Sequence, residues 1–236
     1  MINMIAAFVF SVIESYLFGC IPSAYLVGRA FKGIDIRQIG SRNMGAMNTF
    51  YVIGFWPGML VLVTDIGKGM LALLLSYWIA VYFIHIPASL VVPLEMTAGL
   101  AVIIGHNFPV FLKFKGGKGG ATAIGVLAFL LAWVVPVPLG FGVFKFPLPL
   151  GWVIYLGSFL LLMLITKWPT LSYGISFIAF PLIAWFAYKD TLLTVYSVFI
   201  ALIPILMYIP RLKEIIGSSN GNLKRAVFRK NLKDRL

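Results

Sequence analysis

Residues 105–125, GHNFPVFLKFKGGKGGATAIG, bring lysines and glycines together between two apolar segments. Glycine tolerates the left-handed backbone conformation, so a glycine-rich turn can direct successive N–H groups at one anion. If the apolar run after the turn is helical, the turn also lies at a helix N-terminus, where the helix dipole favours negative charge. The stretch therefore predicts a phosphate or carboxylate site. Its components would be Lys113, Lys115, Gly116, Gly117, Lys118, Gly119 and Gly120.

Membrane topology alone could account for the lysines of this stretch. A lysine-rich turn between two membrane helices satisfies the positive-inside rule, although that rule does not explain four glycines around one lysine. A Walker A loop is excluded, because Gly119 follows Lys118 where that motif has Ser or Thr, and no strand-forming run precedes it. Since only Lys118 has glycines on both sides, we predict that it contributes more to activity than Lys113 does.

A second polar loop, residues 31–57, contains the sequence GSRNMGAMN at positions 40–48. The hydroxyl and amide groups of Ser41, Asn43 and Asn48 suit a small hydroxylated or phosphorylated molecule, and Gly45 permits a tight turn. An ordinary polar turn would have the same composition, so this loop alone leaves both interpretations open.

Several titratable residues lie in or beside the apolar segments. Asp65 and Lys68 are three residues apart, so a helix places them on one face, where we expect an ion pair with a structural role. His106 lies near the end of the segment before the lysine loop. Its imidazole can act as a general base, or it can hydrogen-bond and position the loop, and both roles stay open.

The composition predicts an integral membrane protein. The chain has 236 residues, of which 61% are hydrophobic and 11% charged, and its mean hydropathy is +1.00. The net charge of +12 does not indicate nucleic-acid binding, because the cations fall in short loops and in the tail. With Cys20 as the only cysteine and two histidines, we expect no disulfide, cofactor or metal, carboxylate-bound magnesium being the open alternative.

Seven apolar segments are long enough to cross a hydrocarbon core of about 30 Å as helices. We therefore predict an all-α polytopic membrane protein with seven transmembrane helices. It would form a single domain over residues 1–236, with a basic tail from about residue 211. The predicted spans are residues 5–30, 58–84, 89–111, 122–138, 150–166, 171–188 and 191–208.

Charge asymmetry predicts the orientation of these spans. Sixteen of the nineteen Lys and Arg residues fall in the first loop, in the glycine loop, at Lys167 and in the tail, whereas only Lys145 and Lys189 fall on the opposite side. By the positive-inside rule the N-terminus is outside, and both polar loops and the C-terminus are cytoplasmic. The charge of the tail can equally serve to bind anionic membrane lipid.

Together, GSRNMGAMN and GHNFPVFLKFKGGKGGATAIG resemble two motifs of the bacterial acyl-phosphate:glycerol-3-phosphate acyltransferases, the PlsY family. KGIDIRQIG before the first motif and DIGKG at positions 65–69 extend the similarity from about Glu14 to Gly125. The resemblance implies a seven-helix protein of the bacterial inner membrane with its active site on the cytoplasmic face. It also implies acyl transfer from acyl phosphate to the 1-hydroxyl of glycerol 3-phosphate, giving lysophosphatidic acid without a metal.

The resemblance and the residue types of both loops together give the candidate site. The candidate catalytic residues are Ser41, His106 and Lys118. The candidate substrate- and phosphate-binding residues come from the two motifs and the tail. They are Arg42, Asn43, Gly45, Asn48, Lys115, Gly116, Gly117, Gly119, Thr122, Asn222 and Arg225.

The chain departs from the family pattern in two regions. Arg42 stands where the family has glycine, and residues 49–51, TFY, stand where the family usually has an arginine, which suggests that the cation has moved. The C-terminal motif HRxNIxRLLxGxE is reduced to GNLKRAVFRK, which retains Asn222 and offers Arg225. These differences leave open a paralogue that acylates another phosphorylated alcohol.

The mechanism expected here is mainly electrostatic. Lys118 and loop N–H groups would hold the phosphate, and a phosphate oxygen of the substrate would take the hydroxyl proton, with His106 as the competing base. A transporter of small organic anions is the rival class, since the same cations would serve it. Transporter sites normally lie near the membrane midplane between repeats, and the sequence has no evident repeat.

Overall fold

The computed structural model describes residues 2–130, 150–166 and 169–218. All regular structure in these ranges is helical, which confirms the all-α prediction. Internal contacts divide the chain after Leu130 into two compact units, which are described one at a time.

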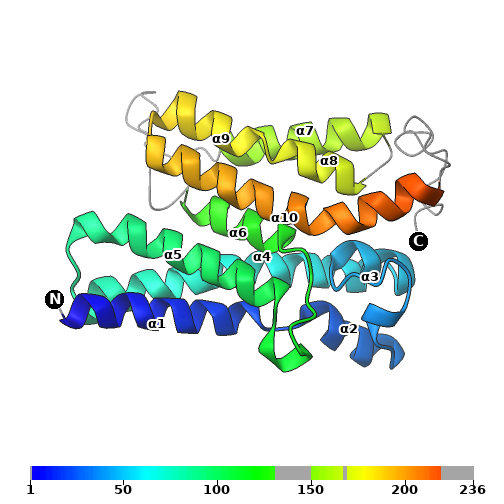
Figure 1. Ribbon diagram of the computed structural model, residues 1–236, viewed down its shortest axis with the longest axis horizontal. Helices are drawn as coiled ribbons and strands as arrows, with labels where there is room; N and C mark the ends of the chain where they lie inside the picture. Colours follow the sequence, from blue (N-terminus) through cyan, green and yellow to red (C-terminus); the bar gives the residue numbers. More distant parts are fainter. Residues whose placement is uncertain (1, 131–149, 167–168, 219–236) are drawn as a thin grey trace. The chain divides into compact units, whose positions relative to one another are not determined.

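Three long helices lie side by side in the first unit (Figure 1): α1 (Ile2–Gly19), α4 (Phe55–Trp78) and α5 (Ala88–Asn107). α1 packs against α5, and α4 packs against both of them and against α6 (Gly120–Phe129). Two shorter helices, α2 (Ser23–Lys32) and α3 (Ala46–Val52), lie at the end of the bundle where the polar loops run. The long helices therefore carry both loops at one end.

The first predicted span, residues 5–30, lies within one segment of membrane-spanning length, Asn3–Lys32, but this segment is not one continuous helix. α1 ends at Gly19, and α2 begins directly after Pro22. Pro22 has no N–H to continue the helical hydrogen bonds, and it disfavours a helical conformation at Ile21. Lys68 Nζ donates a hydrogen bond to the carbonyl of Ile21 at 3.1 Å. The break thus supplies a polar contact inside the bundle.

Two other predicted boundaries also differ from the structure. The loop expected over residues 31–57 contains α3, and α4 begins earlier than expected, at Phe55. α3 packs so closely on α4 that a Cβ atom added to Gly58 would lie 2.4 Å from the ring of Phe50. Helix α5 ends at Asn107, and the 3₁₀ turn Val110–Leu112 follows it within the candidate membrane span Ala88–Leu112.

Glycines allow the long helices to approach at backbone distance. A Cβ atom added to Gly19 of α1 would lie 2.1 Å from the carbonyl oxygen of Val102 in α5. One added to Gly125 of α6 would lie 2.1 Å from the carbonyl oxygen of Ile66 in α4. Close approach through small residues is a common way for membrane helices to pack. Both helix pairs are therefore in direct backbone contact at these positions.

The second unit contains α7 (Leu150–Thr166), α8 (Pro169–Ser176), α9 (Ala179–Ile183) and α10 (Thr191–Ser218). Aromatic rings form its core, with the ring centroid of Tyr155 lying 5.6 Å from that of Phe177 and 5.2 Å from that of Phe180. The sixth predicted span is not one continuous helix, because a turn separates α8 from α9.

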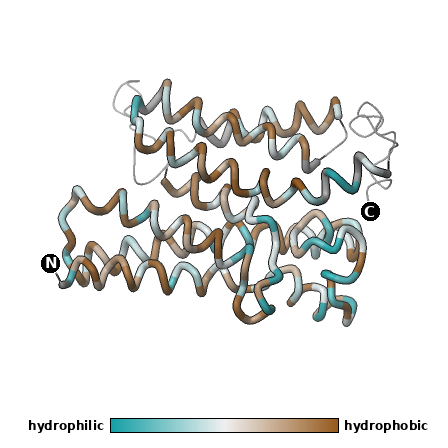
Figure 2. The backbone as a smooth tube through the Cα atoms, viewed as in Figure 1, coloured by the Kyte–Doolittle hydropathy of each residue, from teal (hydrophilic) through white to brown (hydrophobic). Residues whose placement is uncertain are grey.

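Within the described ranges, four helical segments are long and apolar enough to cross a membrane, and three shorter apolar helices overlap the other predicted spans. Figure 2 shows that the long helices of the first unit are mainly hydrophobic and that hydrophilic residues gather in its loops. The four long segments are Asn3–Lys32, Phe55–Phe83, Ala88–Leu112 and Thr191–Pro210, and the shorter ones are Gly120–Phe129, Ile154–Thr166 and Leu171–Phe186.

Candidate phosphate-binding site

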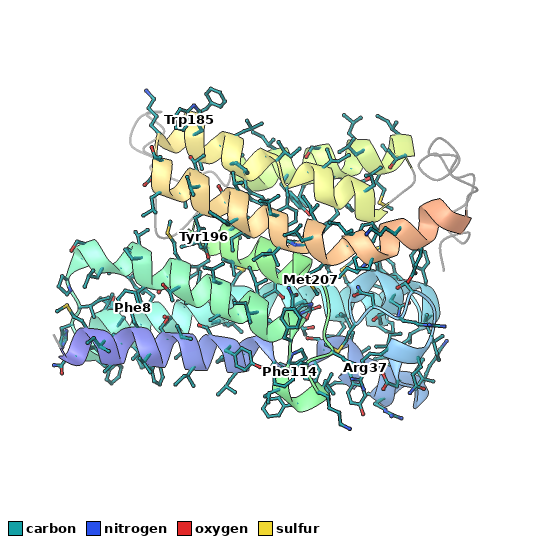
Figure 3. All side chains as sticks on the ribbon, viewed as in Figure 1. Phe8, Arg37, Phe114, Trp185, Tyr196 and Met207 are labelled. Carbon is teal, nitrogen blue, oxygen red and sulfur yellow. The ribbon has the colours of Figure 1, made fainter. Side chains whose placement is uncertain are left out.

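The loop after α2 and the loop after α5 meet around an open pocket of about 520 Å³ in the first unit. Four cationic side chains and one carboxylate line it, and Phe111 and Leu112 form an apolar wall. A concave surface with this excess of positive charge attracts anions. Figure 3 labels Arg37, which lines the pocket, and Phe114 on the loop after α5. The lining residues are Asp35, Arg37, Gln38, Arg42, Phe111, Leu112, Lys113, Lys115 and Gly116.

The carboxylate of Asp35 is occupied by its neighbour Arg37. It accepts hydrogen bonds from the Arg37 backbone N–H and from Nε, both at 3.0 Å, and from Nη2 at 2.8 Å. These bonds hold the pKa of Asp35 below its ordinary value of 3.8, so the ion pair persists at neutral pH. Among the described residues, Arg42, Lys113 and Lys115 have no acidic partner, and they remain available to an anion.

Sharp turns bring two of these cations to the pocket. Arg42 and Lys113 have left-handed backbone conformations, with φ angles of 58° and 55°. Residues with a Cβ atom adopt this region infrequently and at a cost in energy. Sequence reasoning chose Arg42 but gave Lys113 a minor role, because it relied on flanking glycines and not on the direction of the turn.

Asn48 organises the first motif from inside. Its side-chain Oδ1 accepts a hydrogen bond from the Ser41 backbone N–H at 2.9 Å, and its Nδ2 donates to the carbonyls of Ile36 and Ile39, both at 3.0 Å. The residue is only 1% exposed. Asn48 therefore fixes the loop that carries Ser41, while Asn43 and Gly45 lie half-buried on the same loop.

The glycine loop closes the end of helix α5. The N–H of Gly116 donates to the carbonyl of Asn107, and the N–H of Gly117 donates to that of His106, both at 3.1 Å. These carbonyls lie in the last turn of α5, where partners within the helix are missing. The prediction that these two amides point at an anion is therefore wrong, although Gly116 still lines the pocket.

Glycine is required in this loop because of close contacts. A Cβ atom added to Gly117 would lie 2.1 Å from His106 Nε2 and 2.6 Å from the carbonyl oxygen of Met44. Gly117 thus packs on the imidazole and touches the first motif at the same time. Gly119, directly before α6, has a φ angle of 77°, a conformation that favours glycine.

His106 lies beside a buried polar network that joins α2 and α4. Lys68 Nζ lies 2.9 Å from Asp65 Oδ1, which confirms the predicted ion pair, and both side chains are buried. Ser23 Oγ donates to the same oxygen at 2.9 Å, a contact that sequence reasoning missed. His106 is 3% exposed, and its Nδ1 lies 3.7 Å from Asp65 Oδ1. The imidazole therefore lies beneath the loop and does not line the pocket.

The remaining candidate residues are placed as follows. Lys118 is partly buried and does not line the pocket. Thr122 is fully buried in the first turn of α6, and its Oγ1 has no hydrogen-bond partner in the described part of the chain. Asn222 and Arg225 lie outside the described residues. The sequence analysis did not include Arg37 in the site. The signal that could have identified it is the acid Asp35 two residues before Arg37 in a cationic loop.

Apolar helices of membrane-spanning length, with a cationic pocket beside the end of one of them, are the features of an integral membrane protein with a candidate anion site. A model of the glycerol-3-phosphate acyltransferase family matches residues 9–218. The chain therefore belongs to the glycerol-3-phosphate acyltransferase family.

Individual relatives agree with this assignment. The chain is 49% identical over 235 residues to glycerol-3-phosphate acyltransferase 2 of Dehalococcoides mccartyi, covering 99% of this chain and 100% of that protein. Identity to glycerol-3-phosphate acyltransferase of Fusobacterium nucleatum is 33%, covering 92% and 99% of the two chains.

Solved structures agree as well. The glycerol 3-phosphate form of PlsY (YgiH), an integral membrane glycerol 3-phosphate acyltransferase, is 27% identical with a TM-score of 0.71. The match covers 89% of this chain and 92% of that one. The lysophosphatidic acid form of the same protein has a TM-score of 0.69.

Proposed function

We propose that this chain transfers a fatty acyl group from acyl phosphate to the 1-hydroxyl of glycerol 3-phosphate, giving lysophosphatidic acid for phospholipid synthesis. Family membership supports the reaction, and the ligand forms of the PlsY structures support the acceptor and the product. The observation that carries the site is the basic pocket between the two motif loops. Family membership also favours this enzyme over a transporter of small anions.

The reaction needs an activated acyl carbon and a stabilised phosphate leaving group. The 1-hydroxyl oxygen attacks the acyl carbon, the bond from that carbon to the phosphate oxygen breaks, and inorganic phosphate leaves with the hydroxyl proton. Arg42, Lys113 and Lys115 would stabilise the phosphate charge, since each well-placed donor in an oxyanion site contributes about 2.7 to 4 kcal/mol. Because the His106 ring lies beneath Gly117, its proposed role is to position the loop.

The proposed orientation places the N-terminus outside the bacterial inner membrane, with seven spans in one membrane-embedded domain. The active site and the tail would then face the cytoplasm. This proposal rests on the charge asymmetry of the loops. It also agrees with the position of the pocket and of Ala88 at opposite ends of α5.

Labelling with an impermeant thiol reagent tests that orientation. Native Cys20 is buried and should stay unlabelled. A cysteine in place of Ala88 is expected to react from outside intact cells. One in place of Ser219, in the basic tail, is expected to react only in inverted vesicles. The reverse pattern would overturn the orientation.

The identity of the acyl donor gives a direct test of the reaction. We expect lysophosphatidic acid from palmitoyl phosphate and glycerol 3-phosphate in detergent, and little from palmitoyl-CoA. The pocket between the two loops has room for one phosphate head group beside an apolar wall, and neither loop is long enough to form a nucleotide-binding domain. Turnover with palmitoyl-CoA alone would refute the proposal. Turnover with palmitoyl phosphate but with another phosphorylated alcohol would replace only the acceptor.

A further inference from the structure

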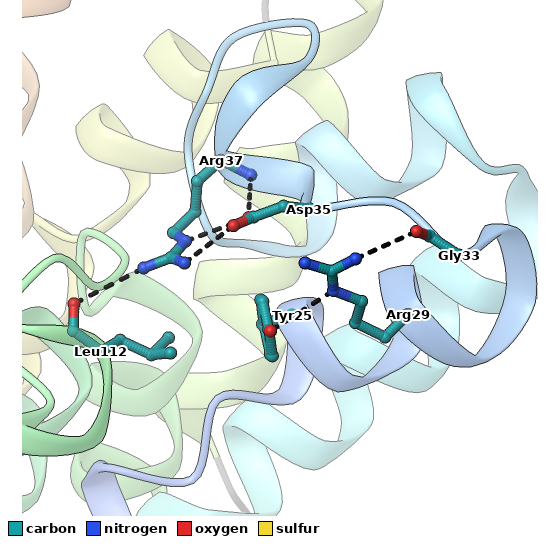
Figure 4. A network of polar contacts seen from close by, with 6 residues as sticks. All are labelled: Tyr25, Arg29, Gly33, Asp35, Arg37 and Leu112. Carbon is teal, nitrogen blue, oxygen red and sulfur yellow. Dashed lines mark hydrogen bonds and ion pairs between the residues drawn. The ribbon is translucent and has the colours of Figure 1, made fainter.

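Arg37 is the residue at which the two pocket-forming loops are joined by polar contacts. It lies in the 3₁₀ turn Ile36–Gln38 of the first loop, and its Nη1 donates to the carbonyl of Leu112 in the second loop (Figure 4). This contact, at 3.5 Å, is the longest that the guanidinium makes. Nη2 and Nε of Arg37 donate to the Asp35 carboxylate at 2.8 and 3.0 Å. Asp35, in the first loop, therefore sets the orientation of the guanidinium.

The aromatic ring of Tyr25, which we call the aromatic platform, further restricts the orientation of the Arg37 guanidinium. The Cζ atom of Arg37 lies 5.2 Å from the ring centroid of Tyr25, within the range of a cation–π contact. Arg29 contacts the same ring, with its Cζ atom at 5.3 Å from the centroid. Arg29 also donates to the Tyr25 hydroxyl at 3.3 Å and to the Gly33 carbonyl at 3.1 Å. Neither acceptor belongs to the second loop. Two arginines thus share one platform, but Arg37 is the one that reaches the second loop.

The loops have a separate apolar connection that does not depend on Arg37. Leu112 packs against a buried cluster that includes Ile36 and Met44. Removal of the guanidinium should therefore leave the fold in place and free the pocket wall to move. A substitution at Arg37 consequently tests the pocket more than it tests folding.

We propose that Arg37 is a positioning residue, which holds Lys113 and Lys115 of the second loop at the correct distance from Arg42 of the first loop for one phosphate group. The proposal rests on the proposed function, since it names the part of that site which sets its width. Asp35 orients the guanidinium, and the contact with Leu112 transmits this orientation to the second loop. Arg37 acts through the three cations and need not touch the phosphate itself.

The experiment compares Arg37→Ala, Arg37→Lys and Arg29→Ala. Arg37→Ala should raise KM for a phosphorylated substrate about tenfold or more, as expected for loss of charged hydrogen bonds, with a smaller change in kcat. Arg37→Lys should not restore KM, because one ammonium group cannot bond both Asp35 oxygens and still reach Leu112. Arg29→Ala removes the same charge from the same ring and should leave KM within about twofold, as for an exposed charge.

Asp35→Asn separates positioning from simple charge attraction. If Arg37 positions the pocket, the loss of its carboxylate partner should weaken phosphate binding. If the pocket only collects positive charge, removal of one negative charge from its lining should strengthen binding. Tighter binding by Asp35→Asn, or equal effects of Arg29→Ala and Arg37→Ala, would overturn the proposal.

A binding measurement keeps this test independent of turnover. Equilibrium binding of inorganic phosphate and of glycerol 3-phosphate is measured for each variant in detergent, together with its unfolding temperature. Wild-type binding without formation of lysophosphatidic acid would refute the proposed reaction, and the variants would still report on Arg37. Unchanged binding by a folded Arg37→Ala variant would refute the positioning role alone.

Discussion

Asp65→Asn is expected to leave little folded protein, whereas the double variant Asp65→Asn/Lys68→Met should fold. The carboxylate and the ammonium group are 2.9 Å apart, and both side chains are buried. Removal of one member of a buried ion pair costs about 3 to 5 kcal/mol, because the other charge stays buried without compensation. The measurements are the monodisperse yield after extraction and the unfolding temperature.

Glu14→Gln is a matched control for that prediction. Glu14 is also a buried acid in a long helix, but within the described part of the chain its carboxylate accepts a hydrogen bond from Ser15 Oγ, at 2.8 Å, and forms no ion pair. Its neutralisation leaves no cation behind, so the variant should be as stable as the wild type or more stable. Equal losses of folded protein in Asp65→Asn and Glu14→Gln would contradict the prediction. They would show that an amide at a buried acidic position destabilises the protein whether or not an ion pair is broken.

The double variant Arg42→Ala/Lys115→Ala is expected to lose at least about 100-fold in kcat/KM while remaining folded. Both side chains are exposed and line the pocket from opposite loops, so their removal affects anion binding more than packing. Steady-state kinetics with palmitoyl phosphate and glycerol 3-phosphate measure the loss. The effect should be larger at low ionic strength, since salt screens exposed charges.

Lys189→Ala is the control for a general loss of positive charge, because Lys189 belongs to the second unit and does not line the pocket. It should retain wild-type kinetics. A single Lys118→Ala variant that loses more activity than the pocket double variant would place the phosphate at the glycine turn and not in the pocket. That result would restore the expectation drawn from the flanking glycines.

The sequence predicted the helical class and the polar loops because hydropathy and charge act over many residues. It also predicted the Asp65–Lys68 pair, since spacing within one helix determines which side chains meet. The break at Pro22 was missed because the apolar run continues through it. Helix α3 was missed because its polar residues suggested a loop.

The site could be predicted only in part. The residue types in both motifs indicated an anion site. They did not indicate which polar groups form hydrogen bonds within the protein and are therefore not free to bind an anion. Asn48 and the amides of Gly116 and Gly117 are bonded to backbone groups, which depends on contacts between distant segments. Arg37 was missed for the same reason, because its contact with Leu112 spans 75 positions of the chain.

The backbone contacts at Gly19 and Gly125 restrict the path of a fatty acyl tail. Not even one methyl group fits between α1 and α5 at Gly19, or between α4 and α6 at Gly125, without displacement of backbone atoms. A hydrocarbon chain therefore cannot be threaded through either helix pair at these levels. An apolar surface does continue from the pocket at Phe111, which is 68% exposed. An acyl chain lying along this surface would let lysophosphatidic acid diffuse into the leaflet without separation of these helices.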